Sequence, residues 1–590
     1  MSDTTQLADS YLLQSALKTD PPVDVSKGKS VAVVFDGNQG GYTSGLIQID
    51  ATSQLTGSKG YASLKDAYLT LPYVITAKET AGSINKSTLS RFACALKCNV
   101  ANVVDSLTVK LNGKKVITET EYKGFWNNLR AMTELSQDEI AKHGADMHLY
   151  PDSWTVINFT KSASATGDGY SNNQIYSASP LDTTLSQAQE PWAYNGGFFK
   201  RLTNTPAPID STQATGAFSW ASFGSTATKN MCQQNGRGAF QEADATSYGN
   251  DKIVGTWYHL LKIRLVDLHP IFKELDLCAN PQLKLRLRIN TGVVAISGTS
   301  STMKLDSATM TAGTTVPIMV APATAAAKTA AGDTITPAAP MNDILATGAQ
   351  LSFAFGPVGN SFTNTSKVGE YLPYAMSRLH IPFYHIKNPS AIIQKPIKTI
   401  RYLDCFAQLF PKAAGTSPDV PTGQLNAAFD LTVSGYKKNV KYVALIPFAD
   451  TTAGHFASVS TVRQYQSPFD SAPWTCMPGA SIRNFQVQLG NENVFTSSHE
   501  YDFESFMDEF SKLGAINGDL SHEISNGLID SVQWSMAQRI LVADCSRISK
   551  KDVPQSLQIS GINGSATGMD LLVLVVLELD RLTGEIHRTD

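Results

Sequence analysis

The sequence predicts an all-β protein in which one β-domain occurs twice. Short apolar runs that are typical of strands recur throughout the 590 residues, and clusters of Gly, Pro, Asn, Ser and Thr separate them. Two regions stand out with the spacing of apolar residues that is typical of helices. Each of these regions follows a strand, a tight turn and a second strand, and the repetition of that order predicts a duplicated domain.

The clearest strand pattern lies at residues 283–289, where aliphatic and basic residues alternate. The aliphatic side chains would lie on one face of the strand, and Lys284, Arg286 and Arg288 on the other. Three cations on one face fit either a solvated sheet surface or a binding surface for a polyanion, and we favour the solvated surface. Other runs typical of strands occupy residues 31–35, 68–76, 107–111, 261–265, 440–448, 485–489 and 571–579.

The first helical region begins near Glu121, and a capping box formed by Ser136 and Glu139 then opens a second short helix. Because glycine commonly ends helices, we expect this second helix to end near Gly144. The other helical region is expected at residues 502–514. The apolar residues at helical spacing are Phe125, Leu129 and Met132 in the first region, and Phe503, Met507, Phe510 and Leu513 in the other.

An offset of 378 positions, which places residue 107 on residue 485, aligns part of the first half with the second half without a gap. Strand residues 107–111 then fall on residues 485–489, and the apolar positions of the two helices coincide. The dipeptide Asn112-Gly113 falls on Gly490-Asn491, and both dipeptides favour hairpin turns. Agreement in strand, turn and helix together supports the duplication.

The expected organisation is an N-terminal arm at residues 1–28, a first β-domain at residues 29–390 and a second at residues 391–590. The boundary is expected in the Pro-punctuated segment 388–398. The first domain carries two insertions that the second lacks, at about residues 150–251 and 292–340. We expect both insertions on one outer face, and the second of them to form a surface β-ribbon or loop.

The composition excludes several classes of protein. Net charge is −3, without the basic excess of a chain that binds nucleic acid along its length. The longest apolar run, at residues 571–577, is far shorter than the roughly 20 residues of a membrane-spanning helix, so no transmembrane segment is expected. Charged residues are 17%, against about 25% in ordinary globular proteins, which fits a surface covered by neighbours or one rich in Ser, Thr and Asn.

We predict no catalytic, cofactor-binding or metal-binding residues. No nucleophile elbow, phosphate-binding loop or zinc-protease motif occurs in the sequence. Cys94 and Cys98 lack a second ligand pair for zinc and are expected to be buried thiols. The seven cysteines are scattered and odd in number, which indicates reduced thiols in an intracellular folding compartment. His143 and His148 are expected on the surface.

Several stretches have the character of strand and turn signatures, namely residues 265–272, 398–403 and 443–448. The most specific is Tyr465-Gln-Ser-Pro-Phe-Asp-Ser-Ala-Pro473, which continues to residue 489. These stretches resemble double jelly-roll major capsid proteins of polinton-like viruses, virophages and, more distantly, adenoviruses. The resemblance covers residues 29–586 and weakens in the insertions. It implies two tandem jelly-roll β-barrels with short accessory helices.

The resemblance also implies a structural protein rather than an enzyme. Three copies would form a pseudo-hexameric capsomer of an icosahedral shell, assembled inside the host cell, with no cofactor and no sequence-specific contact to nucleic acid. Neighbouring capsomers, penton proteins and minor or cement proteins are the implied partners. Two alternatives stay open: a glycan-binding β-sandwich spike or lectin that uses the Trp-bearing first insertion, and a β-sandwich glycosidase with two carboxylates in one cleft.

Overall fold

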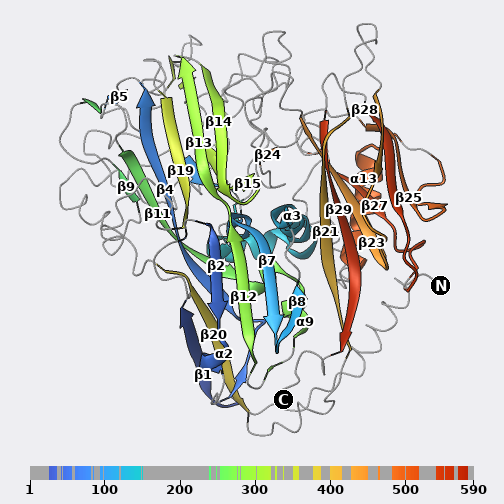
Figure 1. The fold of residues 1–590 in the computed structure, drawn as a ribbon, viewed down its shortest axis with the longest axis horizontal. Coiled ribbons are helices and arrows are strands. Elements are labelled where there is room, and N and C mark those ends of the chain that lie inside the picture. Colours follow the sequence, from blue (N-terminus) through green and yellow to red (C-terminus); the bar gives the residue numbers. More distant parts are fainter. Residues whose placement is uncertain are drawn as a thin grey trace.

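The computed structural model contains two β-barrels that lie side by side (Figure 1). It describes residues 25–35, 42–55, 60–117, 121–150, 253–320, 350–357, 376–386, 399–414, 427–449, 482–516, 540–563 and 569–582, with short gaps inside some ranges, and also residues 238–240, 247–248, 326–327, 336–337, 463–464 and 534. The expected boundary segment 388–398 and the N-terminal arm up to residue 24 lie outside the described residues, so the predicted domain limits stay a prediction.

The first barrel consists of two facing antiparallel sheets. One sheet has the order β1 (Val25–Phe35), β20 (Arg378–Ile386), β4 (Tyr68–Ala81), β11 (Ile253–Arg264). The other has the order β2 (Leu46–Asp50), β12 (Leu283–Ile289), β7 (Val104–Leu111), β8 (Lys114–Ile117). Counted along the chain, the barrel strands run first, eighth, third, sixth in one sheet and second, seventh, fourth, fifth in the other. This is the strand order of a jelly roll.

The second barrel repeats this order strand for strand. Its first sheet is β21 (Thr399–Ala414), β29 (Met569–Leu582), β23 (Val440–Ala449), β27 (Leu541–Asp544). Its second sheet is β22 (Ala427–Thr432), β28 (Leu557–Asn563), β25 (Ile482–Leu489), β26 (Glu492–Asn493). The all-β fold of two tandem jelly rolls is therefore confirmed.

The duplication predicted from the sequence appears at the fourth strand of each barrel. Strands β7 and β25 both lie next to the seventh strand of their sheet, and each of their ends differs by the predicted 378 positions. The turns that follow adopt left-handed backbone conformations, with φ of 77° at Gly113 and 65° at Gly490. Such values favour glycine, which explains why the two turn dipeptides share this residue.

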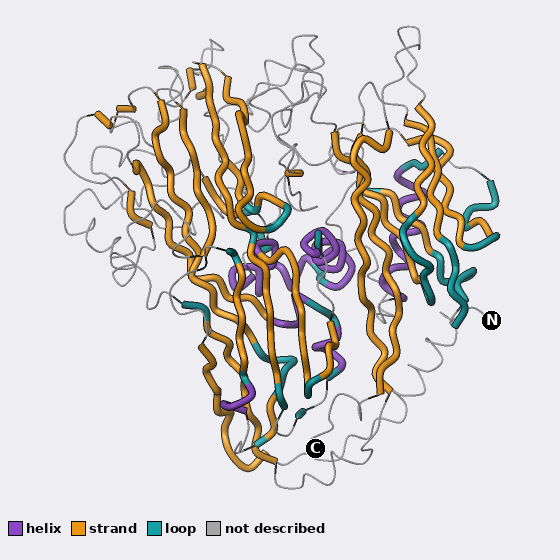
Figure 2. The backbone as a smooth tube through the Cα atoms, in the orientation of Figure 1, coloured by secondary structure: helices purple, strands orange, loops and turns teal. Residues whose placement is uncertain are grey.

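The second insertion begins as a β-ribbon, as expected. Strands β13 (Thr291–Thr299) and β14 (Thr302–Ala312) form a hairpin, and β19 (Gln350–Pro357) joins β13 to β4. This ribbon continues the first sheet beyond the end of the β2-β12-β7-β8 sheet (Figure 2). Most of the first insertion lies outside the described residues, so the expectation that both insertions share one face stays a prediction. The remaining short strands are β3 (Tyr61–Ala62), β5 (Ile84–Asn85), β6 (Cys94–Leu96), β9 (Gly238–Phe240), β10 (Ser247–Tyr248), β15 (Thr315–Val316), β16 (Ile318–Val320), β17 (Ala326–Ala327), β18 (Thr336–Pro337) and β24 (Arg463–Gln464).

In the part of the chain that the structure describes, the helices are few and short. They are α2 (Thr52–Leu55), η2 (Val100–Val103), α3 (Lys123–Glu134), α4 (Gln137–Met147), α8 (Leu265–Leu268), α9 (Ile271–Glu274) and α13 (Phe503–Ile516). The predicted capping box opens α4, because the Glu139 N–H donates to Ser136 Oγ at 3.2 Å and the Ser136 N–H donates to Glu139 Oε2 at 2.9 Å. Among the described residues, no helix is both long and apolar enough to cross a membrane.

The expected end of α4 near Gly144 is wrong, since the helix continues to Met147. The glycine serves a close approach rather than a helix end. The Leu149 N–H donates to the Gly144 carbonyl at 2.8 Å, and a Cβ on residue 144 would lie only 2.6 Å from the Leu149 carbonyl oxygen. The chain that leaves the helix therefore folds back over a position where only glycine fits.

Candidate functional site between the two barrels

The two barrels exchange residues between their hydrophobic cores. Helix α3, which follows the fifth strand of the first barrel, places Phe125, Trp126 and Leu129 in the core of the second barrel. In return, β21 of the second barrel places Ile400 and Tyr402 in the core of the first. Full burial of a side chain of this size stabilises by about 1.5–3 kcal/mol, so the exchange holds each barrel against the other.

His269 lies at the centre of this junction, in the turn between α8 and α9. Its side chain is fully buried, and its Nδ1 accepts a hydrogen bond from the Ile271 N–H at 3.1 Å. The ring proton therefore lies on Nε2, which donates to Asp404 Oδ1 of β21 at 3.2 Å. Burial, together with the nearby Lys123 ammonium, lowers the pKa of His269 to about 4, so the imidazole is neutral at neutral pH.

Aromatic rings continue the contact from His269 to both barrels. The ring of Trp126 meets the ring of His269 edge-on, with 5.7 Å between the ring centroids, and the centroid of the Tyr402 ring lies 5.8 Å from that of His269. The Trp126 Nε1–H donates to the hydroxyl of Tyr442 on β23 at 3.3 Å. Because Trp126 and Tyr442 are both buried, this bond joins α3 to a central strand of the second barrel.

The charged groups of the junction are arranged for cohesion. Burial lowers the pKa of Lys123, whose Nζ lies 5.1 Å from the centroid of the Trp126 ring. Although burial raises the pKa of Asp404, the hydrogen bond from His269 and the nearby positive charge hold it below its usual value. Burial raises the pKa of the Cys405 thiol. A neutral imidazole, a paired carboxylate and a protonated thiol suit a buried clamp rather than a nucleophilic site.

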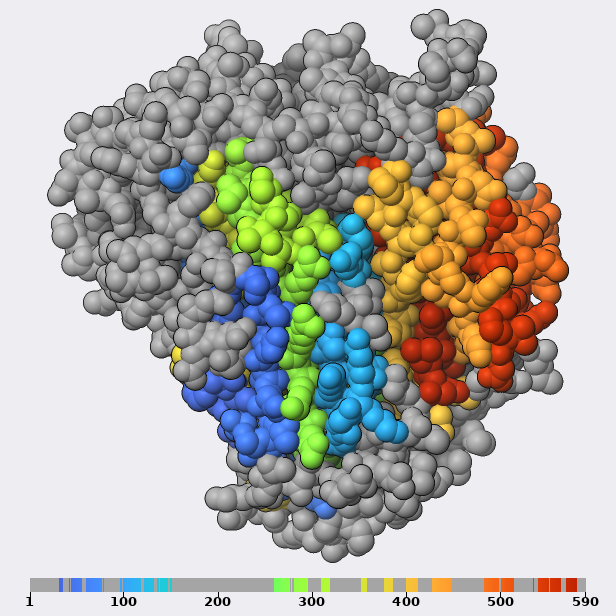
Figure 3. Space-filling model, viewed as in Figure 1, coloured from blue at the N-terminus to red at the C-terminus, as the bar shows by residue number. Residues whose placement is uncertain are grey.

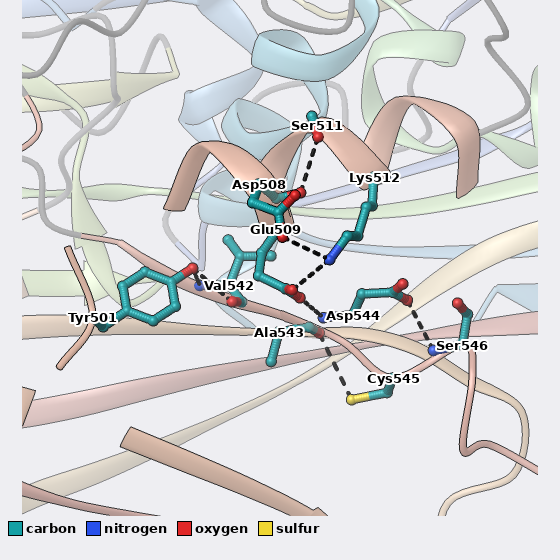
Figure 4. A network of polar contacts seen from close by, with 10 residues as sticks. All are labelled: Tyr501, Asp508, Glu509, Ser511, Lys512, Val542, Ala543, Asp544, Cys545 and Ser546. Atoms are coloured by element: carbon teal, nitrogen blue, oxygen red, sulfur yellow. Dashed lines mark hydrogen bonds and ion pairs between the residues drawn. The ribbon is translucent and has the colours of Figure 1, made fainter. Parts of the chain in front are cut away.

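A second polar network fixes α13 to the second barrel (Figure 4). The Tyr501 hydroxyl donates to the Val542 carbonyl at 2.7 Å and accepts from the Val542 N–H at 2.9 Å. Glu509 Oε2 accepts from the Asp544 N–H at 2.6 Å, and Lys512 forms an ion pair with Glu509 at 2.6 Å. Since β27 is an edge strand of its sheet, these side chains bind backbone groups that would otherwise be open to another strand.

The basic residues predicted on one face of β12 lie on the molecular surface. The β2-β12-β7-β8 sheet faces the viewer in Figure 3, in blue, green and light blue. Lys284 forms an ion pair with Asp50 at 2.8 Å, Arg288 forms one with Glu121 at 3.3 Å, and Arg286 is exposed. These are the features of a solvated sheet face, the interpretation that the sequence favoured.

The remaining candidates from the sequence form no site in the described part of the chain. Cys94 lies on β6 and His143 is exposed on α4 as expected, whereas Cys98 and His148 lie outside the described residues. In the same part of the chain, Cys278, Cys405 and Cys545 are buried. No group of His, Cys, Asp or Glu side chains among the described residues could hold a metal ion. The Trp-bearing part of the first insertion also lies outside them.

The sequence analysis identified Phe125 and Leu129 of the junction as one apolar helix face, but it did not identify the polar residues of the junction or Trp126. His269 falls within the stretch 265–272 that carried the family resemblance, but nothing local distinguishes a clamp from a turn. Its partner Asp404 is 135 positions away, and Trp126 is 316 positions from Tyr442. The helix prediction likewise omitted Phe506, which is fully buried at the centre of the α13 face.

Comparison with protein families and with curated proteins finds no match to the sequence. Several solved structures are similar in fold. A chain of the Sputnik virophage structure is 9% identical, with a TM-score of 0.45, 97% of this chain covered and 90% of that chain. The mavirus major capsid protein is 11% identical, with a TM-score of 0.41 and coverages of 96% and 90%. The Faustovirus major capsid protein is 8% identical, with a TM-score of 0.42 and coverages of 98% and 98%. The strand order of both barrels shows the double jelly-roll fold that the resemblance of the sequence implied.

Proposed function

We propose that this protein is the major capsid protein of an icosahedral virus, a structural subunit that trimerises into pseudo-hexameric capsomers. The observation that carries the proposal is the buried junction between two jelly rolls of the same strand order. It converts two barrels into one rigid unit of double width. A shell subunit needs such rigidity, because its lateral contacts must recur at a fixed angle in every copy.

Two edge strands of the barrels are covered, which supports a role in forming particles. Helix α13 covers β27 at one edge of the second barrel, and β9 pairs with part of β11 at the corresponding edge of the first. Covered edges prevent irregular pairing between chains at high local concentration. Contacts between copies are then left to selected surfaces, which is what an ordered lattice requires.

The proposal places the protein in the virion shell after assembly inside the host cell. Neighbouring capsomers, penton proteins and minor or cement proteins are its proposed partners. The chemistry of the junction supports a structural rather than an enzymatic role, since His269 is fully buried and its hydrogen bond to Asp404 joins the two barrels.

Native mass spectrometry of the purified 63.6 kDa chain, combined with negative-stain electron microscopy, tests the proposal. We expect a trimer whose projection is a pseudo-hexagonal tile, and sheets or shells of such tiles at higher concentration. A chain that stays monomeric at micromolar concentration and forms no tiles would contradict the proposed function.

A further inference from the structure

Large apolar side chains that are exposed occur in two places among the described residues. The first is the outer side of β1, with Val31, Val33 and Phe35 exposed by 44%, 36% and 46%. The second is one end of the second barrel, with Tyr436 and Val553 exposed by 74% and 52%. We name these surfaces the β1 stripe and the second-barrel patch.

The β1 stripe lies on an edge strand. Val34 and Ala32 pack into the first core, so the alternate residues point away from it. Among the described strands β1 pairs with β20 alone, and Figure 1 shows it on the side of the first barrel away from the second. The guanidinium of Arg378 lies 4.9 Å from the centroid of the Phe35 ring. A contiguous apolar stripe on an edge strand marks an interaction surface.

The second-barrel patch is formed by two connections that the backbone holds together. Tyr436 lies between β22 and β23, and Val553 lies between β27 and β28. The Lys437 N–H donates to the Gln555 carbonyl at 2.9 Å, and the Gln555 N–H donates to the Lys437 carbonyl at 2.8 Å. The two exposed side chains therefore belong to one ordered surface.

The duplication relates these two surfaces. Within the chain, the first strand of the second barrel, β21, is covered by the first barrel's connection between its sixth and seventh strands, which contains α8 and α9. The first strand of the first barrel is β1. The second barrel's connection between its sixth and seventh strands contains Val553. The junction within the chain therefore uses β21 and the α8–α9 connection. Their counterparts, β1 in the first barrel and the β27–β28 connection in the second, take no part in this junction and carry exposed apolar side chains.

We propose that the β1 stripe of one copy docks on the second-barrel patch of a neighbouring copy, in the manner in which β21 and the α8–α9 connection meet within one chain. This inference rests on the proposed capsid function, whose lateral contact it specifies. The contact is heterologous, because each copy contributes a different surface to each of its two neighbours. A heterologous contact leaves both end chains of an open complex with a free surface, and a closed ring satisfies them all.

Charge placed on either surface tests the contact. The stripe variant is Val33→Asp with Phe35→Asp, and the patch variant is Tyr436→Asp with Val553→Asp. The control variant is Ala428→Asp with Thr432→Asp, which adds the same charge at two exposed positions on β22. Native mass spectrometry should show the wild-type oligomer for the control and monomers for the other two, with unchanged circular dichroism. If a double variant lost its strand signal, Val33→Thr and Val553→Thr would replace it, each expected to raise the dissociation constant about tenfold.

A mixture of the two interface variants gives the sharper test. The stripe variant keeps an intact patch and the patch variant keeps an intact stripe, so the mixture can form one contact. We expect a complex of two chains in the mixture and none in either variant alone. A patch variant that associates by itself would show that stripes meet each other and would overturn the proposal. If the wild type is an oligomer and the interface variants form the same oligomer, the proposed contact is wrong and the capsid function is unaffected. If the wild type itself is a monomer, the contact and the capsid function are both wrong.

Discussion

Removal of the Tyr501 hydroxyl should loosen the edge of the second barrel. In Tyr501→Phe, the N–H and the carbonyl of Val542 would both lose the oxygen that they bind at 2.9 and 2.7 Å. The aromatic ring would keep its contacts with Phe485 and Trp534, whose centroids lie 5.4 and 6.2 Å away. The substitution therefore isolates the two hydrogen bonds from the packing.

The expected magnitude follows from the burial of this site. A buried polar group left without a partner costs about 1–3 kcal/mol, so two backbone groups that partly recover through water should cost roughly 2–3 kcal/mol together. Opening of β27 should become easier by the same amount, which corresponds to about a 30- to 150-fold faster exchange of the Val542 amide hydrogen.

Hydrogen exchange followed by mass spectrometry, on peptides that span residues 541–544, measures this change directly. Thr432→Val removes a hydroxyl from an exposed residue of β22 and is the matched control, expected to leave the exchange unchanged. Exchange at β27 that is as slow in Tyr501→Phe as in the wild type would refute the idea that this side chain closes the edge.

Three further predictions concern the junction and α4. For His269→Gln we expect a flatter pH dependence of the melting temperature. Between pH 6.5 and about 4 the unfolded wild type binds a proton that the folded state excludes, so the free energy of unfolding of the wild type should decrease by about 1.4 kcal/mol for each unit by which the pH is lowered. Equal slopes in the two proteins would contradict this. Trp126→Phe should cost about 1–2 kcal/mol in denaturant unfolding, and less when Tyr442→Phe is also present, because the hydroxyl that loses the Trp126 bond is then absent. Additive losses would argue against the bond. Gly144→Ala should lower the melting temperature despite alanine's helix propensity, since its Cβ meets the Leu149 carbonyl, while Ala145→Gly at an exposed position should cost only about 1 kcal/mol; a stabilised Gly144→Ala would contradict the close approach.

The sequence predicted what is periodic or repeated. Alternation at residues 283–289 gave a strand with alternating burial, and the 378-position offset matched β7 to β25 at both ends. Such local patterns can be predicted from the sequence because one face of the strand must be buried, whatever position the strand takes in the fold. The capping box at Ser136 was predicted for the same reason, since its two bonds span three residues.

The junction could not be predicted in this way. Its contacts join residues that are far apart in the sequence, and a histidine next to a proline is as typical of a turn as of a buried hydrogen bond. The end of α4 failed for a related reason. Gly144 is required by Leu149, a residue beyond the helix, whereas the prediction considered only the local preference of glycine for helix ends.

The exchange of core residues has a consequence for synthesis of the chain. Strand β1 is synthesised long before its partner β20, because Val34 of β1 pairs with Leu379 of β20. Ile400, which belongs to the core of the first barrel, is synthesised later still. The nascent first barrel therefore remains open until the chain has entered the second barrel. Contacts between such distant residues fold slowly and leave apolar surface accessible meanwhile. Efficient production of this protein should accordingly depend on chaperones that hold the first 400 residues until β21 is complete.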